Sequence, residues 1–256
     1  MDGANGAIVS SNSINVNGSA ASGIYVNGCE NTIIDGNKFN IDLADYFVVV
    51  NNSDRTIISN NVGQGQISGV YELLAVYSVA GISQDTQIVN NSFSFAGTAA
   101  GVGVIVGANT TLTQVNENCF IGVATGIDVQ TNASNRRVDI CQNSLAGTTT
   151  PITWLNDADV YIYNNEGFRT ENRGYPVTIT SGNTRVTVAH GLAVTPPIAG
   201  IRLTLVDAVG GSGGATSNSV QGPFIVSTDA TNIVMGCSAD PGVSGMKIAW
   251  EATFSV

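Results

Sequence analysis

Charged side chains are scarce in this chain of 256 residues, at 11%, whereas average soluble chains carry roughly 25%. The hydrophobic fraction is 43%, which excludes disorder of the charged, weakly hydrophobic kind. Basic residues are the fewest: 9 Lys+Arg stand against 19 Asp+Glu, for a net charge of −10. Nucleic acids and anionic membranes both require clustered cations. We therefore expect no nucleic-acid partner, and neutral carbohydrate or another protein is favoured.

Long apolar runs and metal-binding motifs are also missing. No run approaches the ~20 residues of a membrane-spanning helix, and the N-terminus lacks the basic and apolar regions of a signal peptide. We therefore expect no membrane insertion. One histidine and no CxxC spacing predict no metal and no cofactor, and calcium-binding GGxGxD repeats are absent. We expect four free thiols, those of Cys29, Cys119, Cys141 and Cys237.

Proline and asparagine divide the chain in two. The first 150 residues contain no proline, and the remainder contains all six. Residues 1–168 hold 23 asparagines, whereas residues 169–256 hold four. This shift in composition predicts two domains, residues 1–168 and residues 169–256.

Asparagines in the first part recur with an aliphatic residue three positions earlier. They are Asn12, Asn37, Asn61, Asn91, Asn118, Asn143 and Asn165. The repeat of roughly 22–30 residues, with short apolar runs and Asn/Gly turns, predicts stacked coils of short strands, because one coil cannot bury its own apolar face. Equivalent asparagines would then form a ladder of amide hydrogen bonds, which proline would interrupt. The alternative is an Asn-rich β-sandwich.

These Ile-x-x-Asn-x-Phe repeats, such as 34–39 and 88–93, resemble right-handed parallel β-helix proteins of the pectate-lyase-like type. The resemblance covers residues 7–168 and implies an all-β fold with a parallel β-helix of about seven coils.

The tail resembles the C-terminal domains that follow β-helices in bacteriophage tail spikes. The resemblance rests on residues 184–192, 195–197, 240–242 and 249–250. In that family three chains wind together, and the spike binds or cleaves a bacterial surface polysaccharide. The resemblance therefore implies a homotrimer on the virion, at the extracellular side of the phage tail, with a C-terminal domain for trimerisation or receptor binding.

Short alternating strands fill the tail and predict a small β-sandwich. They are expected at 177–180, 185–188, 201–206, 224–226, 233–235 and 247–256. The Ser-Gly-Asn turn at 181–183 predicts that the first two strands form a hairpin. Residues 210–214 are expected to form a flexible loop and not a phosphate cradle, since no helix follows and no lysine is adjacent. His190, alone at a strand end, is expected to be structural.

The alternation of strand side chains predicts one polar outward face. If the repeated aliphatic residues point inward, their neighbours point outward. On the later coils this predicts a substrate-binding set, because amides and aromatic rings suit sugar hydroxyls and C–H faces: Gln114, Asn116, Tyr161 and Tyr163. An ordinary solvated face or a protein contact are the alternatives.

Glycoside hydrolysis needs two carboxylates. The candidate catalytic residues are Asp139, Asp128 and Glu117, while Asp157 and Asp159 are more typical of turn caps. Few basic residues on the coils disfavour elimination chemistry. An active chain would therefore be an endoglycosidase, and the resemblance to tail spikes implies O-antigen or capsule as its substrate.

A second outward column predicts a contact between chains. Its members Tyr25, Val49, Ala75 and Ile105 would form an exposed apolar stripe. Cover by a loop, such as residues 63–72, is the alternative.

Three hypotheses follow. The favoured one is a phage tail-spike fragment that recognises, with or without depolymerising, a bacterial surface polysaccharide. The others are a secreted bacterial polysaccharide-degrading enzyme with an appended binding module, and a purely structural trimerisation or adhesion segment. Because the repeats begin at residue 7 without a cap, we also expect a longer protein, so catalytic residues upstream of the chain are the alternative to the candidates within it.

Overall fold

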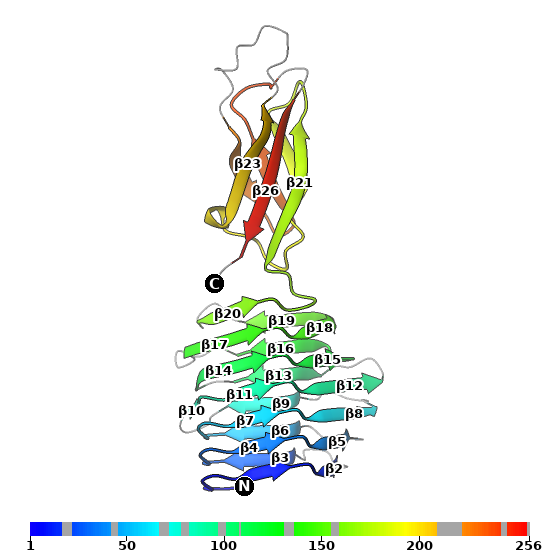
Figure 1. Ribbon diagram of the computed structural model, residues 1–256, viewed down its shortest axis with the longest axis vertical. Coiled ribbons are helices and arrows are strands. Elements are labelled where there is room, and N and C mark those ends of the chain that lie inside the picture. The colour runs from blue at the N-terminus through cyan, green and yellow to red at the C-terminus, as the bar shows by residue number, and fades with distance from the viewer. Residues whose placement is uncertain are drawn as a thin grey trace. The chain divides into compact units, whose positions relative to one another are not determined.

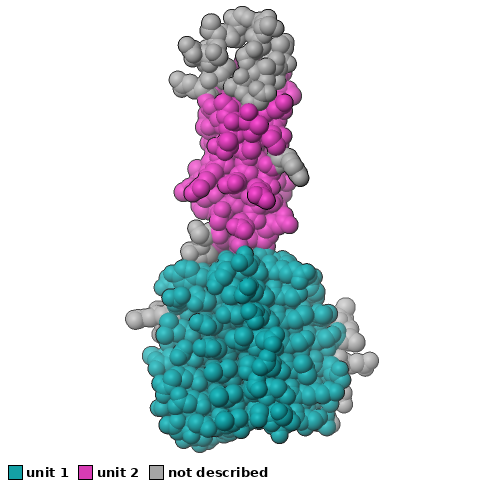
Figure 2. Space-filling model, in the orientation of Figure 1, with its two compact units in different colours: residues 1–168, 256 teal, residues 169–255 magenta. Residues whose placement is uncertain are grey.

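The computed structural model describes the chain except for eleven short segments: residues 17–21, 42–45, 67–71, 78–81, 97–100, 108, 131–135, 155–158, 209–221, 242–244 and 255–256. It divides into two compact units, Met1–Phe168 and Arg169–Ser255, which are coloured separately in Figure 2. The first is an all-β parallel solenoid, in which successive coils stack as Figure 1 shows.

Sheet I of the solenoid carries the aliphatic half of each repeat. Its strands follow one another in the order β1 (Ile8–Ser10), β4 (Ile33–Asp35), β7 (Ile57–Ser59), β11 (Gln87–Val89), β14 (Thr110–Asn116), β17 (Arg136–Cys141) and β20 (Val160–Tyr163), while β10 (Ser83–Gln84) also pairs with β14. The register aligns Val9, Ile34, Ile58, Ile88, Val115, Ile140 and Ile162 in one inward column. The predicted repeat is therefore confirmed residue by residue.

Two further parallel sheets complete the coils. Sheet II contains β2 (Ser13–Val16), β5 (Lys38–Ile41), β8 (Val62–Gln66), β12 (Ser92–Ala96), β15 (Cys119–Ile121) and β18 (Ser144–Gly147). Sheet III contains β3 (Ser22–Asn27), β6 (Tyr46–Asn51), β9 (Glu72–Tyr77), β13 (Val102–Val106), β16 (Thr125–Val129) and β19 (Thr150–Trp154). These strands coincide with the second apolar run of each repeat.

The asparagine ladder lies at the corner between sheets I and II. Asn61 donates through Nδ2 to Asn91 Oδ1 at 2.9 Å, and Asn91 donates to Asn118 at 2.9 Å. The same contact links every neighbouring pair from Asn12 to Asn165. The residue before each ladder asparagine has φ between 54° and 64°, which turns the chain sharply. The predicted ladder is confirmed, and its buried amides hold the coils in register.

The apolar stripe predicted to be exposed is largely buried within the chain. Val49 and Ile105 are only 1% and 5% exposed, and Tyr46 and Val102 pack against them. Tyr25 is exposed, and the side chain of Ala75 lies outside the described residues. The prediction was wrong for Val49 and Ile105, because strand alternation alone does not show which side chains cover an outward face.

The second unit consists of two three-stranded antiparallel sheets. One has the order β21 (Glu171–Ile179), β26 (Met246–Thr253), β23 (Ile201–Ala208), and the other β22 (Arg185–Ala189), β25 (Asn232–Gly236), β24 (Phe224–Thr228). A single 3-10 turn, η1 (Ile198–Gly200), precedes β23. The predicted loop at 210–214 lies outside the described residues.

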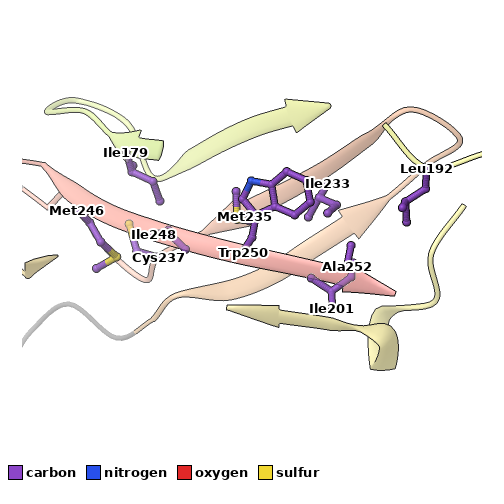
Figure 3. Packing of buried hydrophobic residues seen from close by; sticks show 10 residues of the cluster. All are labelled: Ile179, Leu192, Ile201, Ile233, Met235, Cys237, Met246, Ile248, Trp250 and Ala252. Carbon is purple, nitrogen blue, oxygen red and sulfur yellow. The ribbon is translucent and has the colours of Figure 1, made fainter. Parts of the chain in front are cut away.

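One apolar core joins the two sheets of the second unit. Figure 3 shows Trp250 of β26 beside Met235 and Ile233 of β25, so residues of both sheets meet in this core. The hairpin predicted around residues 181–183 was wrong, because β21 pairs with β26 and β22 pairs with β25. Ile179 and Val186 instead pack into the shared core from opposite sheets, which buries more apolar surface than a flat hairpin would.

Candidate functional site

The outward face of sheet I gathers the predicted sugar-binding side chains on its last three strands. Gln114, Asp139 and Tyr161 are register partners on β14, β17 and β20. Asn116 and Tyr163 stand in the next outward column, at the level of Cys141. Neighbouring parallel strands lie about 4.8 Å apart. We call Gln114, Asn116, Asp139, Tyr161 and Tyr163 the strip.

Arg137 organises the centre of the strip. Its Nε lies 3.1 Å from Asp139 Oδ2, and its guanidinium carbon lies 5.6 Å from the ring centroid of Tyr161. The cation therefore compensates the carboxylate and covers one face of the ring, an arrangement that orients both side chains. Tyr161 is still 48% exposed, so ring surface is left for a ligand.

Cys141 connects the second column of the strip. Its thiol donates to Asn116 Oδ1 at 3.0 Å. A hydrogen bond with Cys141 also raises the pKa of the Tyr163 phenol, and the nearby charge of a Cys141 thiolate would raise it further. The phenol is therefore protonated at neutral pH and its oxygen can accept a hydrogen bond from a ligand, while Asn116 keeps its amide hydrogens for one.

A pocket on the same face extends the strip toward the first coils. It has a volume of about 320 Å³ and is lined by Asn31, Ile33, Arg55, Ile57, Asp85 and Gln87. The register runs from Ile57 through Gln87 to Gln114, so the pocket and the strip share one column. Sequence reasoning did not single out this pocket. Its one signal was a polar residue two positions before the outward column on the three coils that line it, namely Asn31, Arg55 and Asp85.

Arg55 forms the polar wall of that pocket. Its Nη2 lies 2.9 Å from Glu30 Oε2, and its Nε donates to Asn31 Oδ1 at 2.7 Å. Both contacts cross from one coil to the next. They hold the guanidinium against the corner and leave Ile33 and Ile57 as the apolar floor.

The structure does not bring all predicted carboxylates to the strip. Asp128 lies on β16 in sheet III, where it accepts a hydrogen bond from Thr153. Glu117 is exposed at the corner between sheets I and II, with φ of 58°. Asp159 is exposed on the face of the strip, one strand from Arg137 and diagonal to Asp139. Residue 157 lies outside the described residues.

His190 is structural, as predicted. It is fully buried, its Nδ1 accepts the Leu192 N–H at 3.0 Å, and its Nε2 lies 3.0 Å from Asp229 O. The ring therefore carries its proton on Nε2 and holds two loops of the second unit together.

The described residues contain no group of three or more His, Cys, Asp or Glu side chains placed to hold a metal ion. All four cysteines are free. In the described parts of the chain, no helix has the length and apolar character to cross a membrane.

Comparison with known proteins gives structural matches alone. No family model matches the chain, and no curated protein does. Among solved structures, the chain is similar to the Gp54 tailspike of Acinetobacter baumannii bacteriophage AP22, in complex with an A. baumannii capsular saccharide, with 13% identity and a TM-score of 0.42. It is also similar to the tailspike gp49 of Pseudomonas phage LKA1, with 10% identity and a TM-score of 0.38. The chain is covered to 98% in both matches and spans 60% of each tailspike.

Proposed function

We propose that this chain is part of a phage tail spike that recognises a bacterial surface polysaccharide along the outward face of sheet I. The observation that carries the proposal is the row Gln114–Asp139–Tyr161, three register partners with three complementary chemistries. An amide, a compensated carboxylate and an exposed ring stand on successive coils. Polysaccharides offer hydroxyl groups and C–H faces at a similar repeat.

The chemistry of the strip suits a neutral sugar chain. Gln114 and Asn116 offer amide donors and acceptors, and Asp139 accepts hydrogen bonds from hydroxyl groups. The exposed rings of Tyr161 and Tyr163 provide flat surfaces for C–H faces. The apolar floor of the neighbouring pocket extends the same track toward β4 and β7.

Binding is favoured over depolymerisation. Hydrolysis needs an acid and a base or nucleophile roughly 5–9.5 Å apart. Asp139 is paired with Arg137, whereas Asp128 and Glu117 stand on other parts of the coil. In this proposal the main role of Asp139 is to bind sugar. Endoglycosidase activity on O-antigen or capsule requires a second carboxylate. That carboxylate would come from Asp159, from a neighbouring chain or from a segment upstream of this one.

The architecture in this proposal is a β-helix of seven coils, residues 1–168, followed by a β-sandwich, residues 169–256, in a homotrimer on the virion. The repeat motifs and the tail motifs that resemble tail spikes support it, as do seven paired strands in sheet I and the two packed sheets of the second unit. The carbohydrate class is proposed on the chemistry of the strip.

The test is binding of purified capsule or O-antigen fragments to the full chain by calorimetry. Tyr161→Ala should weaken binding by about tenfold, since a stacked ring contributes about 0.5–1.5 kcal/mol beyond the apolar area it buries, and about 1.4 kcal/mol corresponds to a factor of ten. Tyr25→Ala is the matched control, because Tyr25 is 43% exposed but lies on sheet III. Equal losses in both variants, or equal affinity in wild type and Tyr161→Ala, would refute the proposed site.

A further inference from the structure

A second polar pocket lies wholly within the second unit. It has a volume of about 530 Å³ and is lined by Arg169, Glu171, Asn172, Arg173, Glu251, Ala252 and Thr253. These residues come from the start of β21 and the end of β26, which pair antiparallel with Arg173 opposite Glu251 and Glu171 opposite Thr253. The pocket shares no residue with the strip on the solenoid.

The guanidinium groups at this pocket form no ion pair within 4.0 Å among the described residues. Glu251 is opposite Arg173 on one side and Arg202 on the other. Nevertheless, the ion pairs within 4.0 Å among the described residues are Arg55–Glu30 and Arg137–Asp139, both in the solenoid. Arg169, Arg173 and Arg202 are therefore available to an anion, although the chain as a whole carries a net charge of −10.

Two features of the pocket are held in place by the fold. The Asn172 side chain donates through Nδ2 to His190 O at 2.6 Å, which leaves its Oδ1 as an acceptor. Gly191 makes room beside it, since a Cβ there would meet Asn172 Nδ2 at 3.2 Å and Arg169 Nη1 at 4.0 Å. The Arg169 guanidinium thus lies on the same side of Gly191 as the fixed Asn172 amide, and Arg169 is exposed.

We infer that this pocket binds an acidic sugar, that is, a hexuronate-type unit with one carboxylate and several hydroxyl groups. The guanidinium groups of Arg169 and Arg173 match a carboxylate, with which arginine forms charge-assisted and often bidentate hydrogen bonds. The carboxylates of Glu171 and Glu251 can only accept, so they need the hydroxyl donors of a ligand. Thr253 and Asn172 supply further partners for hydroxyl groups.

The mixed charge of the lining separates this ligand from other anions. A phosphate dianion would bring two negative charges to two carboxylates and only one hydroxyl group to satisfy them. The side chain of an acidic peptide offers a carboxylate without neighbouring hydroxyls. A hydroxylated monocarboxylate satisfies both the arginines and the glutamates of the lining. The binding of an acidic sugar by this pocket does not depend on sugar binding by the strip on the solenoid.

The experiment titrates the full chain with sodium glucuronate and, separately, with methyl glucoside, a neutral sugar of the same ring, while amide shifts are followed by NMR. Glucuronate should shift signals of residues around the pocket at millimolar concentrations and bind at least about tenfold more tightly than the glucoside. Acetate, phosphate and a short poly-glutamate peptide complete the series and should bind more weakly than glucuronate.

Arg173→Gln and Arg169→Gln should each weaken glucuronate binding about tenfold. Arg185→Gln is the matched control, since Arg185 is an exposed arginine on β22 in the other sheet. Circular dichroism verifies that each variant is folded. The inference is overturned if glucuronate and the glucoside bind equally, or if neither shifts any signal. It is also overturned if Arg185→Gln loses as much affinity as the pocket variants, or if acetate, phosphate or the peptide binds more tightly than glucuronate. Because Tyr161→Ala should leave glucuronate binding unchanged, failure here is distinguishable from failure of the strip.

Discussion

The ring of Phe47 fills the space that Gly63 leaves inside the solenoid. Gly63 is in register with Phe39 and Phe93 on sheet II, so the column of aromatic side chains lacks one member at that coil. Phe47 enters from sheet III and lies with its centroid 5.1 Å from that of Phe39 and 4.9 Å from that of Phe93. A Cβ at position 63 would be 2.4 Å from Phe93 and 2.8 Å from Phe47.

Changes at either partner should therefore be costly. Gly63→Ala forces rings apart in a packed interior, with an expected loss of about 1–3 kcal/mol in unfolding free energy. Phe47→Ala leaves a cavity and should cost about 3–5 kcal/mol. Phe224→Ala, at a side chain 46% exposed, is the control and should cost far less. Urea denaturation followed by tryptophan fluorescence measures all three, and a small effect for Phe47→Ala would contradict this packing.

The asparagine ladder predicts a second stability effect. Asn91→Ala removes an amide that is 1% exposed and bonded to its neighbours on both sides. It should cost about 1–3 kcal/mol, because partners on adjacent coils are left buried and unpaired. Asn15→Ala is the matched control, since Asn15 accepts the same kind of bond from Asn40 at 3.0 Å but in an exposed position. Equal losses by urea denaturation would show that burial of the ladder does not matter.

Four buried threonines predict a gain in stability. Within the described chain the hydroxyls of Thr32, Thr56, Thr86 and Thr113 have no hydrogen-bond partner. The next coil places Val138 in register with Thr113. Thr56→Val should therefore raise the unfolding free energy by about 1 kcal/mol or more, since an unpaired buried hydroxyl is replaced by a methyl group of similar shape.

Thr110→Val provides the control for the threonine column. Thr110 is equally buried, but its hydroxyl donates to Gly107 O at 3.2 Å. That variant should lose stability in the same urea experiment. A loss in Thr56→Val of similar size would mean that the Thr56 hydroxyl has a partner in solution.

Two hydrogen-bonded carboxylates at the surface, one half-buried and one exposed, predict how stability depends on acid. Hydrogen bonds from Asn60 and Ser59 lower the pKa of Asp35 in the solenoid, and the backbone N–H groups of Thr231 and Asn232 lower the pKa of Asp229 in the second unit. A lowered folded-state pKa stabilises the protein above the unfolded-state pKa, and this contribution disappears as pH falls through the folded-state value. Melting temperatures of wild type should therefore fall on acidification below about pH 4.

Asp35→Asn and Asp229→Asn should each reduce the fall of melting temperature below about pH 4. Neither variant should change the slope of melting temperature against pH between about pH 6 and 8. The two variants report on separate units, so their effects should add. Melting curves of Asp229→Asn that keep the full acid dependence would show that the loop at 229–232 does not hold the carboxylate.

The sequence predicts those features of the fold and of the strip that repeat from coil to coil, and it does not predict the features that break the repeat. Asn91 and Ile88 recur with the coil, so spacing alone predicted their columns and the row Gln114–Asp139–Tyr161. The insertion of the Phe47 ring into the space beside Gly63 does not recur from coil to coil. It depends on how the neighbouring rings pack in three dimensions, which residue spacing does not predict. The burial of Val49 depends on the packing of Tyr46 against it. The alternation of inward and outward side chains along a strand does not predict such packing.

The catalytic candidates give the sharpest prediction about chemistry. Asp139 and Asp159 lie on one face in adjacent coils, with Cα atoms roughly 8 Å apart by strand spacing and rise, whereas Asp128 belongs to sheet III. The chain should release reducing ends from purified host polysaccharide slowly or not at all, because Arg137 holds Asp139 in an ion pair at 3.1 Å. Any turnover should fall at least about a hundredfold in Asp139→Asn and Asp159→Asn, the size expected when a general acid or base is lost. Asp128→Asn should leave the rate unchanged. Robust turnover that survives both strip variants would place the catalytic residues elsewhere, and turnover lost in Asp128→Asn alone would favour sheet III over sheet I as the active face.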